Sequence, residues 1–353
     1  MINVNGKFDL YSMTLAELSD FLKSIGEPSF RAKQIAQWLT LGVPISEMSN
    51  LSKSLREKLS DMCVDTLPRV KEKLTSRIDG TVKYLFELYD GATIESVFMR
   101  YKHGNTLCIS SQVGCFMGCK FCASTIGGKE RDLRPSEMLG QVIAANKDTG
   151  ERVSNIVMMG IGEPLDNYDN VIRFLELVNR EDGLNIGYRH ISLSTCGIVP
   201  KIKELAKVQL PITLSISLHA SNDKKRSEIM PINNKWNISE LLDACVYYYK
   251  HTGRRISFEY TLISGKNDTA ADANELADLL ISAFAGSGAP IHVNLIRVNP
   301  VVETGFSEGS TESANEFAKR LEERGIVATV RRRLGRDVNA ACGQLRRSRK
   351  TER

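Results

Sequence analysis

The feature that most constrains this chain is an alternation of two hydrophobic periods from Thr106 onward. Short apolar segments of strand length are separated by longer segments with helical spacing. The strand candidates are 107–110, 155–159, 191–194, 212–218, 256–262, 291–298 and 326–330. Repeated strand–helix units pack as a parallel sheet covered by helices, with right-handed connections. The alternation predicts an α/β fold, as an open sheet or a barrel, whose strand ends carry the active site.

The residues before this region follow different patterns. Thr14 and Glu17 have the spacing of a capping box at the start of a helix, and two more helices are predicted near 30–39 and 51–59. Strand-like segments on both sides of Gly91 then predict a β-hairpin. We expect a helical domain, a hairpin extension, a core domain and a basic tail, at 1–65, 66–100, 101–345 and 346–353.

Composition places the chain among ordinary globular proteins, with 42% hydrophobic and 25% charged residues. The first residues lack a basic segment followed by an apolar one, and no apolar run approaches the roughly 18 to 20 residues of a membrane span. We therefore expect a cytoplasmic protein without a membrane partner.

The formal net charge is only +5, but basic residues crowd the last part of the sequence. This density suits a phosphate backbone, and it is equally typical of a solvated basic tail. The residues concerned are Arg331, Arg332, Arg333, Arg336, Arg346, Arg347, Arg349, Lys350 and Arg353.

Three of the eight cysteines form a C-x3-C-x2-C run directly after a strand candidate: Cys115, Cys119 and Cys122. Clustered thiols indicate metal ligation or redox chemistry more than a disulfide framework. Structural 4Fe-4S clusters normally take four cysteines, so three would leave one iron open for chemistry. The alternative is zinc, but structural zinc requires four ligands, and no His or Cys flanks the run at a suitable spacing.

Several strand candidates end in polar or glycine-rich segments. The segment 158–164 contains Gly162, which allows close backbone approach to a ligand, and Glu163, whose carboxylate could receive an ammonium group. Alone, this motif is a weak signal. Ser194, Ser217, His219 and Asn299 end other strand candidates, where such side chains suit a ligand pocket, although a lone histidine is more often a hydrogen-bonded core residue.

At the cysteine run the sequence resembles the radical S-adenosylmethionine (SAM) superfamily. Further motifs, spread over nearly the whole chain, resemble the dual-specificity adenine-C2 methyltransferases of 23S rRNA and tRNA. These motifs are TLCISSQVGC, MMGIGEPLDN, LSTCGIVP, SISLHA, MPIN, VNLIRVNP and DVNAACGQL. The resemblance implies a partial (βα) barrel, a 4Fe-4S cluster, SAM, and methylation at carbon 2 of adenine 2503 in 23S rRNA and of adenine 37 in tRNAs.

The resemblance also implies roles for individual residues. The expected cluster ligands are Cys115, Cys119 and Cys122, and the expected SAM contacts are Gly162, Glu163, Ser194, Ser217, Leu218, His219 and Asn299. Cys342 would receive a methyl group, Cys108 would later form a disulfide with it, and Glu95 would accept a proton. Without the resemblance, the two cysteines would be interpreted as buried small hydrophobes and Glu95 as a solvent-facing strand residue.

The chemistry explains why such residues are needed. Carbon 2 of adenine lies between two ring nitrogens and is too electron-poor to attack a sulfonium methyl group. The similar enzymes load the methyl group on the thiolate at Cys342, convert it to a methylene radical that adds to carbon 2, and release the product through the base and the second thiol. Ribosomal RNA, tRNA and an electron donor such as flavodoxin are the expected partners of a monomer.

Two other functions remain open from the sequence. A sister group methylates carbon 8 of the same ribosomal adenine and shares both thiols and the cluster loop, although Pro164 favours the carbon 2 group. An RNA-binding assembly protein with a structural iron cluster is the second alternative, and the additional thiol pair argues against it.

Overall fold

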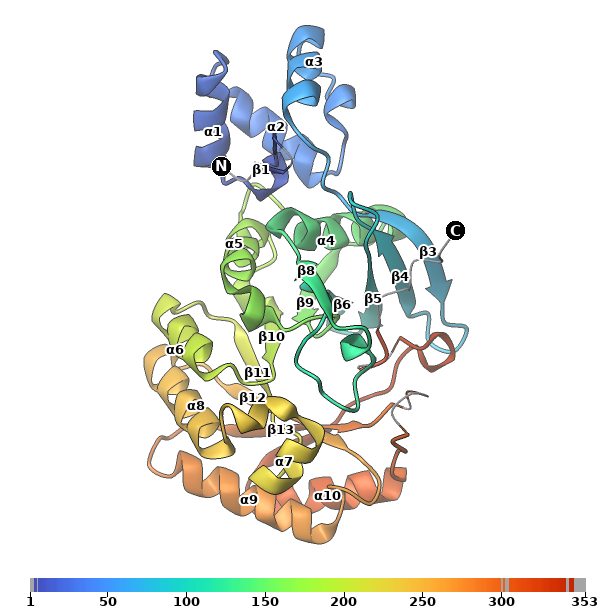
Figure 1. Ribbon diagram of the computed structural model, residues 1–353, viewed down its shortest axis with the longest axis vertical. Helices are drawn as coiled ribbons and strands as arrows, with labels where there is room; N and C mark the ends of the chain where they lie inside the picture. The colour runs from blue at the N-terminus through green and yellow to red at the C-terminus, as the bar shows by residue number, and fades with distance from the viewer. Residues whose placement is uncertain (1–2, 5, 300, 302–304, 341–342, 346–353) are drawn as a thin grey trace.

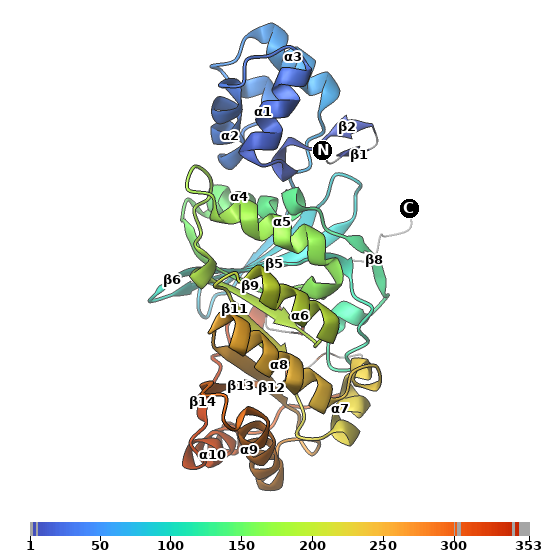
Figure 2. The same cartoon turned by 90° about the vertical axis from the view of Figure 1, so that its left-hand side faces the viewer.

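The computed structural model describes residues 3–4, 6–299, 301, 305–340 and 343–345. The predicted tail at 346–353 and Cys342 lie outside them. The molecule is elongated, with a cluster of N-terminal helices at one end and a curved sheet covered by helices making up the rest (Figures 1 and 2). Within the described part of the chain, no helix combines the length and apolarity needed to cross a bilayer.

The N-terminal helices are α1 (Leu15–Ser24), α2 (Arg31–Thr40) and α3 (Lys53–Met62). The predicted capping box is confirmed: Thr14 Oγ1 accepts a hydrogen bond from the Glu17 amide at 3.2 Å, and the Glu17 carboxylate accepts one from the Thr14 amide at 2.8 Å. The apolar faces of the three helices bury a hydrophobic core of their own.

A buried carboxylate joins this helical unit to the rest of the molecule. Asp9 accepts hydrogen bonds from the hydroxyls of Ser12 and Thr66 and, at 2.7 Å, from that of Ser136 in the first turn of α4 (Pro135–Thr149). Burial raises the pKa of Asp9 despite these three donors. The network fixes where the helical unit meets α4.

A ten-stranded sheet forms the centre of the molecule, in the order β14-β13-β12-β11-β10-β9-β6-β5-β4-β3. Strands β3 to β6 pair antiparallel, whereas β6 and β9 to β14 pair parallel. The edge strands β14 and β3 do not pair, so the barrel is open. The strand bounds are β3 (Arg69–Thr75), β4 (Val82–Glu87), β5 (Thr93–Tyr101), β6 (Gly104–Cys108), β9 (Val153–Met158), β10 (Ile191–Thr195), β11 (Thr213–Ser217), β12 (Ile256–Leu262), β13 (Ile291–Arg297) and β14 (Val327–Val330).

The structure therefore confirms the predicted α/β fold and extends the predicted hairpin. Strands β4 and β5 form that hairpin, but they belong to a four-stranded meander that continues the main sheet. Strand β3 was missed because all seven of its residues are exposed and it lacks the apolar alternation of a half-buried strand. A short pair, β7 (Gln112–Gly114) and β8 (Lys129–Asp132), was also missed; it frames the cysteine loop.

Helices cover the outer side of the curved sheet, and the last described part of the chain lies on its inner side (Figures 1 and 2). One continuous hydrophobic core fills the space between sheet and helices. Besides α4, these helices are α5 (Tyr168–Asn179), α6 (Val199–Val208), α7 (Asp223–Ile229), α8 (Ile238–Thr252), α9 (Ala270–Phe284) and α10 (Thr311–Glu323).

Candidate active site

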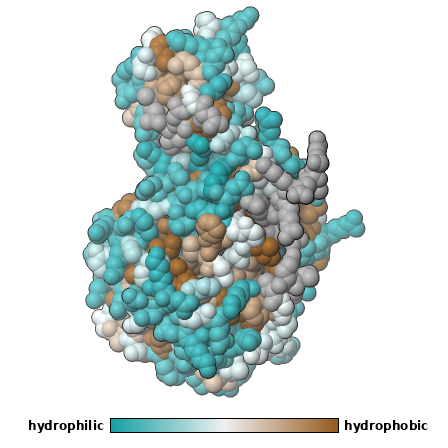
Figure 3. Space-filling model, viewed as in Figure 1, coloured by the Kyte–Doolittle hydropathy of each residue, from teal (hydrophilic) through white to brown (hydrophobic). Residues whose placement is uncertain are grey.

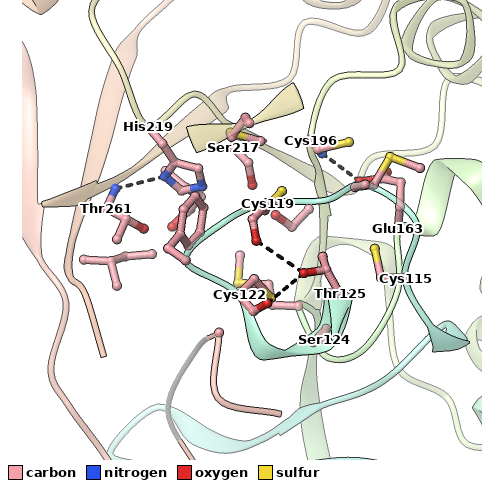
Figure 4. A pocket seen from close by; sticks show the side chains of 18 of the residues that line it. Cys115, Cys119, Cys122, Ser124, Thr125, Glu163, Cys196, Ser217, His219 and Thr261 are labelled. Atoms are coloured by element: carbon pink, nitrogen blue, oxygen red, sulfur yellow. Dashed lines mark hydrogen bonds between the residues drawn. The ribbon is translucent and has the colours of Figure 1, made fainter. Parts of the chain in front are cut away.

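A pocket of about 910 Å³, open to solvent, lies where β9 to β13 end. The space-filling view shows a hollow with apolar and neutral side chains in an otherwise mostly hydrophilic face (Figure 3). Its lining includes most of the predicted cofactor residues: Cys115, Cys119, Cys122, Gly162, Glu163, Ser194, Ser217, His219 and Asn299. Figure 4 labels the three cysteines, Glu163, Ser217 and His219 among them. The alternation of strands and helices in the sequence predicts a site at this end of the sheet.

The three cysteines lie on the loop between β7 and β8. The Cys122 amide donates to the Cys119 carbonyl at 3.1 Å, and the Thr125 hydroxyl donates to the carbonyls of Cys119 and Cys122 at 3.4 and 3.0 Å (Figure 4). A bond from the Lys120 amide to the Ile229 carbonyl, at 2.9 Å, anchors the loop to the end of α7. These contacts turn three cysteines that are close in sequence toward one pocket.

The residues present fit a 4Fe-4S cluster. Burial raises the pKa of Cys115 to about 12 and raises that of Cys119 well above its ordinary value, and the nearby thiol of Cys122 raises both pKa values further. Binding to iron is what would keep such thiols deprotonated. Within the described ranges, no group of three His, Cys, Asp or Glu side chains could hold a single metal ion, whereas in a 4Fe-4S cluster each cysteine binds a different iron.

Glycine is required at position 162. Gly162 has a φ of +108°, and a Cβ at this position would lie 2.6 Å from the Cβ of Gln112. Gln112 in turn accepts a hydrogen bond from the Glu163 amide at 2.9 Å. The backbone of the glycine-rich segment therefore packs directly against the strand that precedes the cysteines.

We expect Gly162→Ala to lower SAM affinity at least about tenfold and to destabilise the fold by about 2 to 4 kcal/mol, because backbone strain adds to the displacement of Gln112. Isothermal titration calorimetry and urea unfolding measure the two effects. Gly150→Ala is the matched control, since Gly150 also has a positive φ (+67°) but an added Cβ meets nothing within 4 Å. Equal SAM affinity of the two variants would contradict the role of Gly162.

Glu163 is buried and held by backbone donors. Its carboxylate accepts hydrogen bonds from the Leu165 amide at 3.0 Å and from the Cys196 amide at 2.7 Å (Figure 4). Burial raises the pKa of Glu163, and the hydrogen bonds to Cys196 and Thr195 oppose the rise. The carboxylate is thus fixed against the end of β10.

His219 occupies a strained backbone position at the end of β11, with a φ of +57°. Its Nδ1 accepts a hydrogen bond from the Thr261 amide at 2.9 Å (Figure 4), and burial lowers the pKa of the imidazole to about 3. The ring is therefore neutral at physiological pH, with its proton on Nε2. Its edge packs against Phe121 of the cysteine loop, with ring centroids 4.9 Å apart.

Leu218 is the one predicted SAM contact that does not line the pocket. Its side chain is fully buried in the core between sheet and helices. Its backbone is engaged at both ends: the amide donates to the Glu259 carbonyl at 3.1 Å, and the carbonyl accepts from Arg226 Nε at 3.1 Å. Any contribution of Leu218 to the site is through the strand end that it shapes.

Two further residues at the site were missed. Glu259, buried on β12, lines the pocket and accepts a hydrogen bond from Asn294 at 2.7 Å; burial raises its pKa. Arg226 of α7 is 1% exposed and donates to the carbonyls of Cys196, Ser217 and Leu218. Position at a strand end could have indicated neither, because Glu259 lies within its strand and Arg226 on a helix.

The charge in the pocket suits SAM. Two buried carboxylates, Glu163 and Glu259, line it together with the guanidinium of Arg331 and the neutral His219. SAM carries an ammonium, a sulfonium and a carboxylate group, and opposite charges in a buried site attract these strongly.

A smaller pocket adjoins the first and shares Asn299 and Arg331 with it. Cys108 lines this second pocket, as do Arg297, Arg331, Arg332 and Arg333. Cys108 faces Val97 across the β5–β6 ladder, so Glu95 lies two residues from its cross-strand partner, on the same face of the sheet. Glu95 lines neither pocket and is buried, with an ion pair to Lys83 at 2.9 Å.

The segment that carries Cys342 is anchored on both sides of the residues that the structure does not describe. Before them, the Gly335 amide donates to Asp79 and the Asn339 carbonyl accepts from Lys83. After them, the Gly343 carbonyl accepts from the Ala123 amide at 2.7 Å, in the cysteine loop. Three residues, 340–342, separate these two anchored positions in the sequence.

Comparison with known proteins agrees with this geometry. Residues 109–280 match the Radical SAM superfamily, and residues 8–64 match the ribosomal RNA large subunit methyltransferase N-terminal domain. Two probable dual-specificity RNA methyltransferases RlmN are similar. The one from Alkaliphilus oremlandii is 55% identical over 97% of this chain and 98% of its own; the one from Lachnoclostridium phytofermentans is 51% identical over 99% and 97%.

A solved structure of a radical SAM methyltransferase from Sphaerobacter thermophilus superposes with a TM-score of 0.90. It is 43% identical, and the match covers 96% of this chain and 99% of that one. The chain belongs to the RlmN family of dual-specificity RNA methyltransferases, within the radical SAM superfamily.

Proposed function

We propose that this enzyme methylates carbon 2 of an adenine in 23S rRNA and in tRNA. The observation that supports this most is the pair of adjoining pockets, one containing the three cysteines and the carboxylates, the other containing Cys108 and four arginines. Described residues on either side of Cys342 line both pockets: Gly343 lines the first, and Ala340 and Leu345 line the second. One pocket suits a cationic cofactor, and the other suits an RNA nucleotide with its phosphate.

In this proposal Cys115, Cys119 and Cys122 hold a 4Fe-4S cluster, and SAM contacts the predicted set, with Leu218 acting through its backbone. The set is Gly162, Glu163, Ser194, Ser217, Leu218, His219 and Asn299. Together the two cofactors, when bound, supply a carbon-centred radical. The protein residues orient the ligand: Glu163 receives an ammonium group, and His219 Nε2 donates a hydrogen bond. The apolar walls limit access of water to the radical.

Glu95, Cys108 and Cys342 form the acceptor side of the site. The sulfur of Cys342 carries the methyl group, and the carbon of that group, after the radical removes one of its hydrogen atoms, forms the bond to carbon 2 of the adenine. Glu95 accepts the proton from carbon 2, and Cys108 forms a disulfide with Cys342 as the methylated RNA leaves. The position of Cys108 and Glu95 on one face of β5 and β6 supports this assignment.

The experiment is mass spectrometry of 23S rRNA and tRNA from cells that lack the enzyme, complemented with wild type, Cys342→Ala or Cys245→Ala. Cys245 is buried in α8 outside both pockets and serves as the control. We expect 2-methyladenosine with wild type and Cys245→Ala, and none with Cys342→Ala. Appearance of 8-methyladenosine would instead assign the carbon 8 reaction, and absence of both would reject the proposed methyl transfer.

The proposed reaction also implies a location and an electron donor for the enzyme. We place it in the cytoplasm with its RNA substrates, working with a flavodoxin-type electron donor. In this proposal Arg331, Arg332 and Arg333 bind the phosphate backbone of the RNA. This is the phosphate-binding interpretation of the basic C-terminal sequence, as opposed to a solvated basic tail.

A further inference from the structure

Lys83 of β4 makes an ion pair that is more buried than the others on the antiparallel meander. Its Nζ lies 2.9 Å from Glu95 Oε1, and the two side chains are only 11% and 10% exposed. The pair between Lys71 and Glu87 on the same meander is 49% and 41% exposed. Burying two charges costs desolvation energy that their attraction does not reliably recover. Stability alone therefore explains this pair poorly.

The same ammonium group has a second partner. Lys83 Nζ donates a hydrogen bond to the Asn339 carbonyl at 3.2 Å. Asn339 lies three residues before Cys342 in the sequence. One cation thus links the carboxylate assigned as the base to the segment assigned to carry the methyl group.

Other contacts hold the same segment against the meander. The Arg77 amide donates to Asp337 at 2.9 Å, and the Gly335 amide donates to Asp79 at 2.9 Å. Gly335 is tightly packed, since an added Cβ would lie 2.6 Å from that of Ala340. Among these contacts with the meander, the one to Lys83 is nearest in sequence to Cys342, and Lys83 also contacts Glu95.

We propose that Lys83 is a positioning residue for proton removal. Its ion pair orients the Glu95 carboxylate, and its hydrogen bond holds the backbone carbonyl of Asn339, three residues before Cys342 in the sequence. In the release step the proton moves from carbon 2 to an oxygen of Glu95, and Lys83 is not the acceptor. This role rests on the proposed function of Glu95 and Cys342.

The test uses reconstituted enzyme with 23S rRNA and tRNA isolated from cells lacking the enzyme. Lys83→Met should lower kcat at least about tenfold with an unchanged KM for RNA, and a covalent Cys342–RNA adduct should accumulate, because removal of the proton slows. Lys83→Arg should restore most of kcat, since it keeps the charge. Glu95→Gln should show the larger loss, and the double variant should be no slower than Glu95→Gln alone. Lys71→Met, which removes the exposed pair, should resemble wild type.

Hydrogen exchange on the protein without cofactors independently tests whether the hydrogen bond from Lys83 to the Asn339 carbonyl holds this segment in place. Lys83→Met should speed exchange at 339–345, and Lys83→Arg and Lys71→Met should not. If Lys83→Met proves too unstable in thermal unfolding, Lys83→Gln removes the charge and keeps hydrogen-bond donors, and the predictions for kcat and for the accumulating adduct apply to it.

Specific results would overturn the role of Lys83. A raised KM with unchanged kcat would mean that Lys83 contacts RNA, and an equal loss of kcat in the wild-type and Glu95→Gln backgrounds would mean that it does not act through Glu95. Unchanged hydrogen exchange at 339–345 in Lys83→Met would mean that the contact with Asn339 does not hold this segment in place. If Glu95→Gln leaves adduct release unchanged, or if no methylated Cys342 forms in any variant, the proposed function itself fails.

Discussion

Cys119→Ala should yield a protein without its iron–sulfur cluster and with RNA methylation reduced to background. Cys119 lies between the other two cysteines in sequence, and its carbonyl accepts hydrogen bonds from Cys122 and Thr125. With two thiolates left, the proposed ligand set lacks one of its three cysteines, and we expect that the cofactor that supplies the hard chemistry is not retained. Iron and acid-labile sulfide analysis, with the visible absorption spectrum, measures the loss directly.

Cys245→Ala is the control for this experiment. Cys245 is fully buried in the core between sheet and helices, so the variant loses packing, at a cost of about 1 to 2 kcal/mol, but no ligand. We expect it to retain iron, sulfide and activity. A Cys119→Ala protein with the iron content of wild type would refute the assignment of the cluster to this loop.

Arg226→Met should destabilise the protein by about 3 to 5 kcal/mol, the largest effect that we expect from a side chain outside the predicted ligand set. The guanidinium donates to three carbonyls, those of Cys196, Ser217 and Leu218, and to the side chain of Asn233 at 3.0 Å. Methionine fills much of the volume but leaves several buried acceptors without donors. Urea unfolding measures the change in the free energy of unfolding.

The same substitution should weaken SAM binding, because the three carbonyls belong to the ends of β10 and β11 beside the pocket. The matched control is Arg324→Met, which removes an exposed ion pair with Asp278 and should change stability by less than about 1 kcal/mol. If Arg226→Met is no less stable than Arg324→Met, the buried hydrogen bonds are not what holds these strand ends together.

Much of the fold could be predicted because hydrophobic period reports burial directly. The strand expected at 256–262 has the bounds of β12, and every residue of that strand is buried. The capping box at Thr14 was equally local, since both of its hydrogen bonds join residues three apart. Strand β3 could not be predicted in this way because it lies at the sheet edge and has no buried face. Its sequence therefore shows no alternation of apolar and polar residues.

The site was predictable only where a motif or a strand end pointed to it. Glu163 and His219 stand in such motifs, and the structure brings both to the pocket. Arg226 and Lys83 do not, because their roles depend on carbonyls and carboxylates that are distant in sequence: Lys83 and Asn339 are separated by 256 residues. Leu218 shows the converse, because a position in a motif did not reveal that its side chain turns into the core.

The anchoring of the Cys342 segment has a consequence for biosynthesis. Ser124 donates to the Leu345 carbonyl at 2.7 Å across 221 residues of sequence. At about 5 to 20 residues per second, a ribosome needs on the order of 10 to 40 s to make that stretch. During this interval the cysteine loop of the nascent chain lacks its contacts with Gly343 and Leu345. We therefore expect that iron and sulfide can reach the cysteine loop of the nascent chain before Cys342, the proposed methyl carrier, has been synthesised.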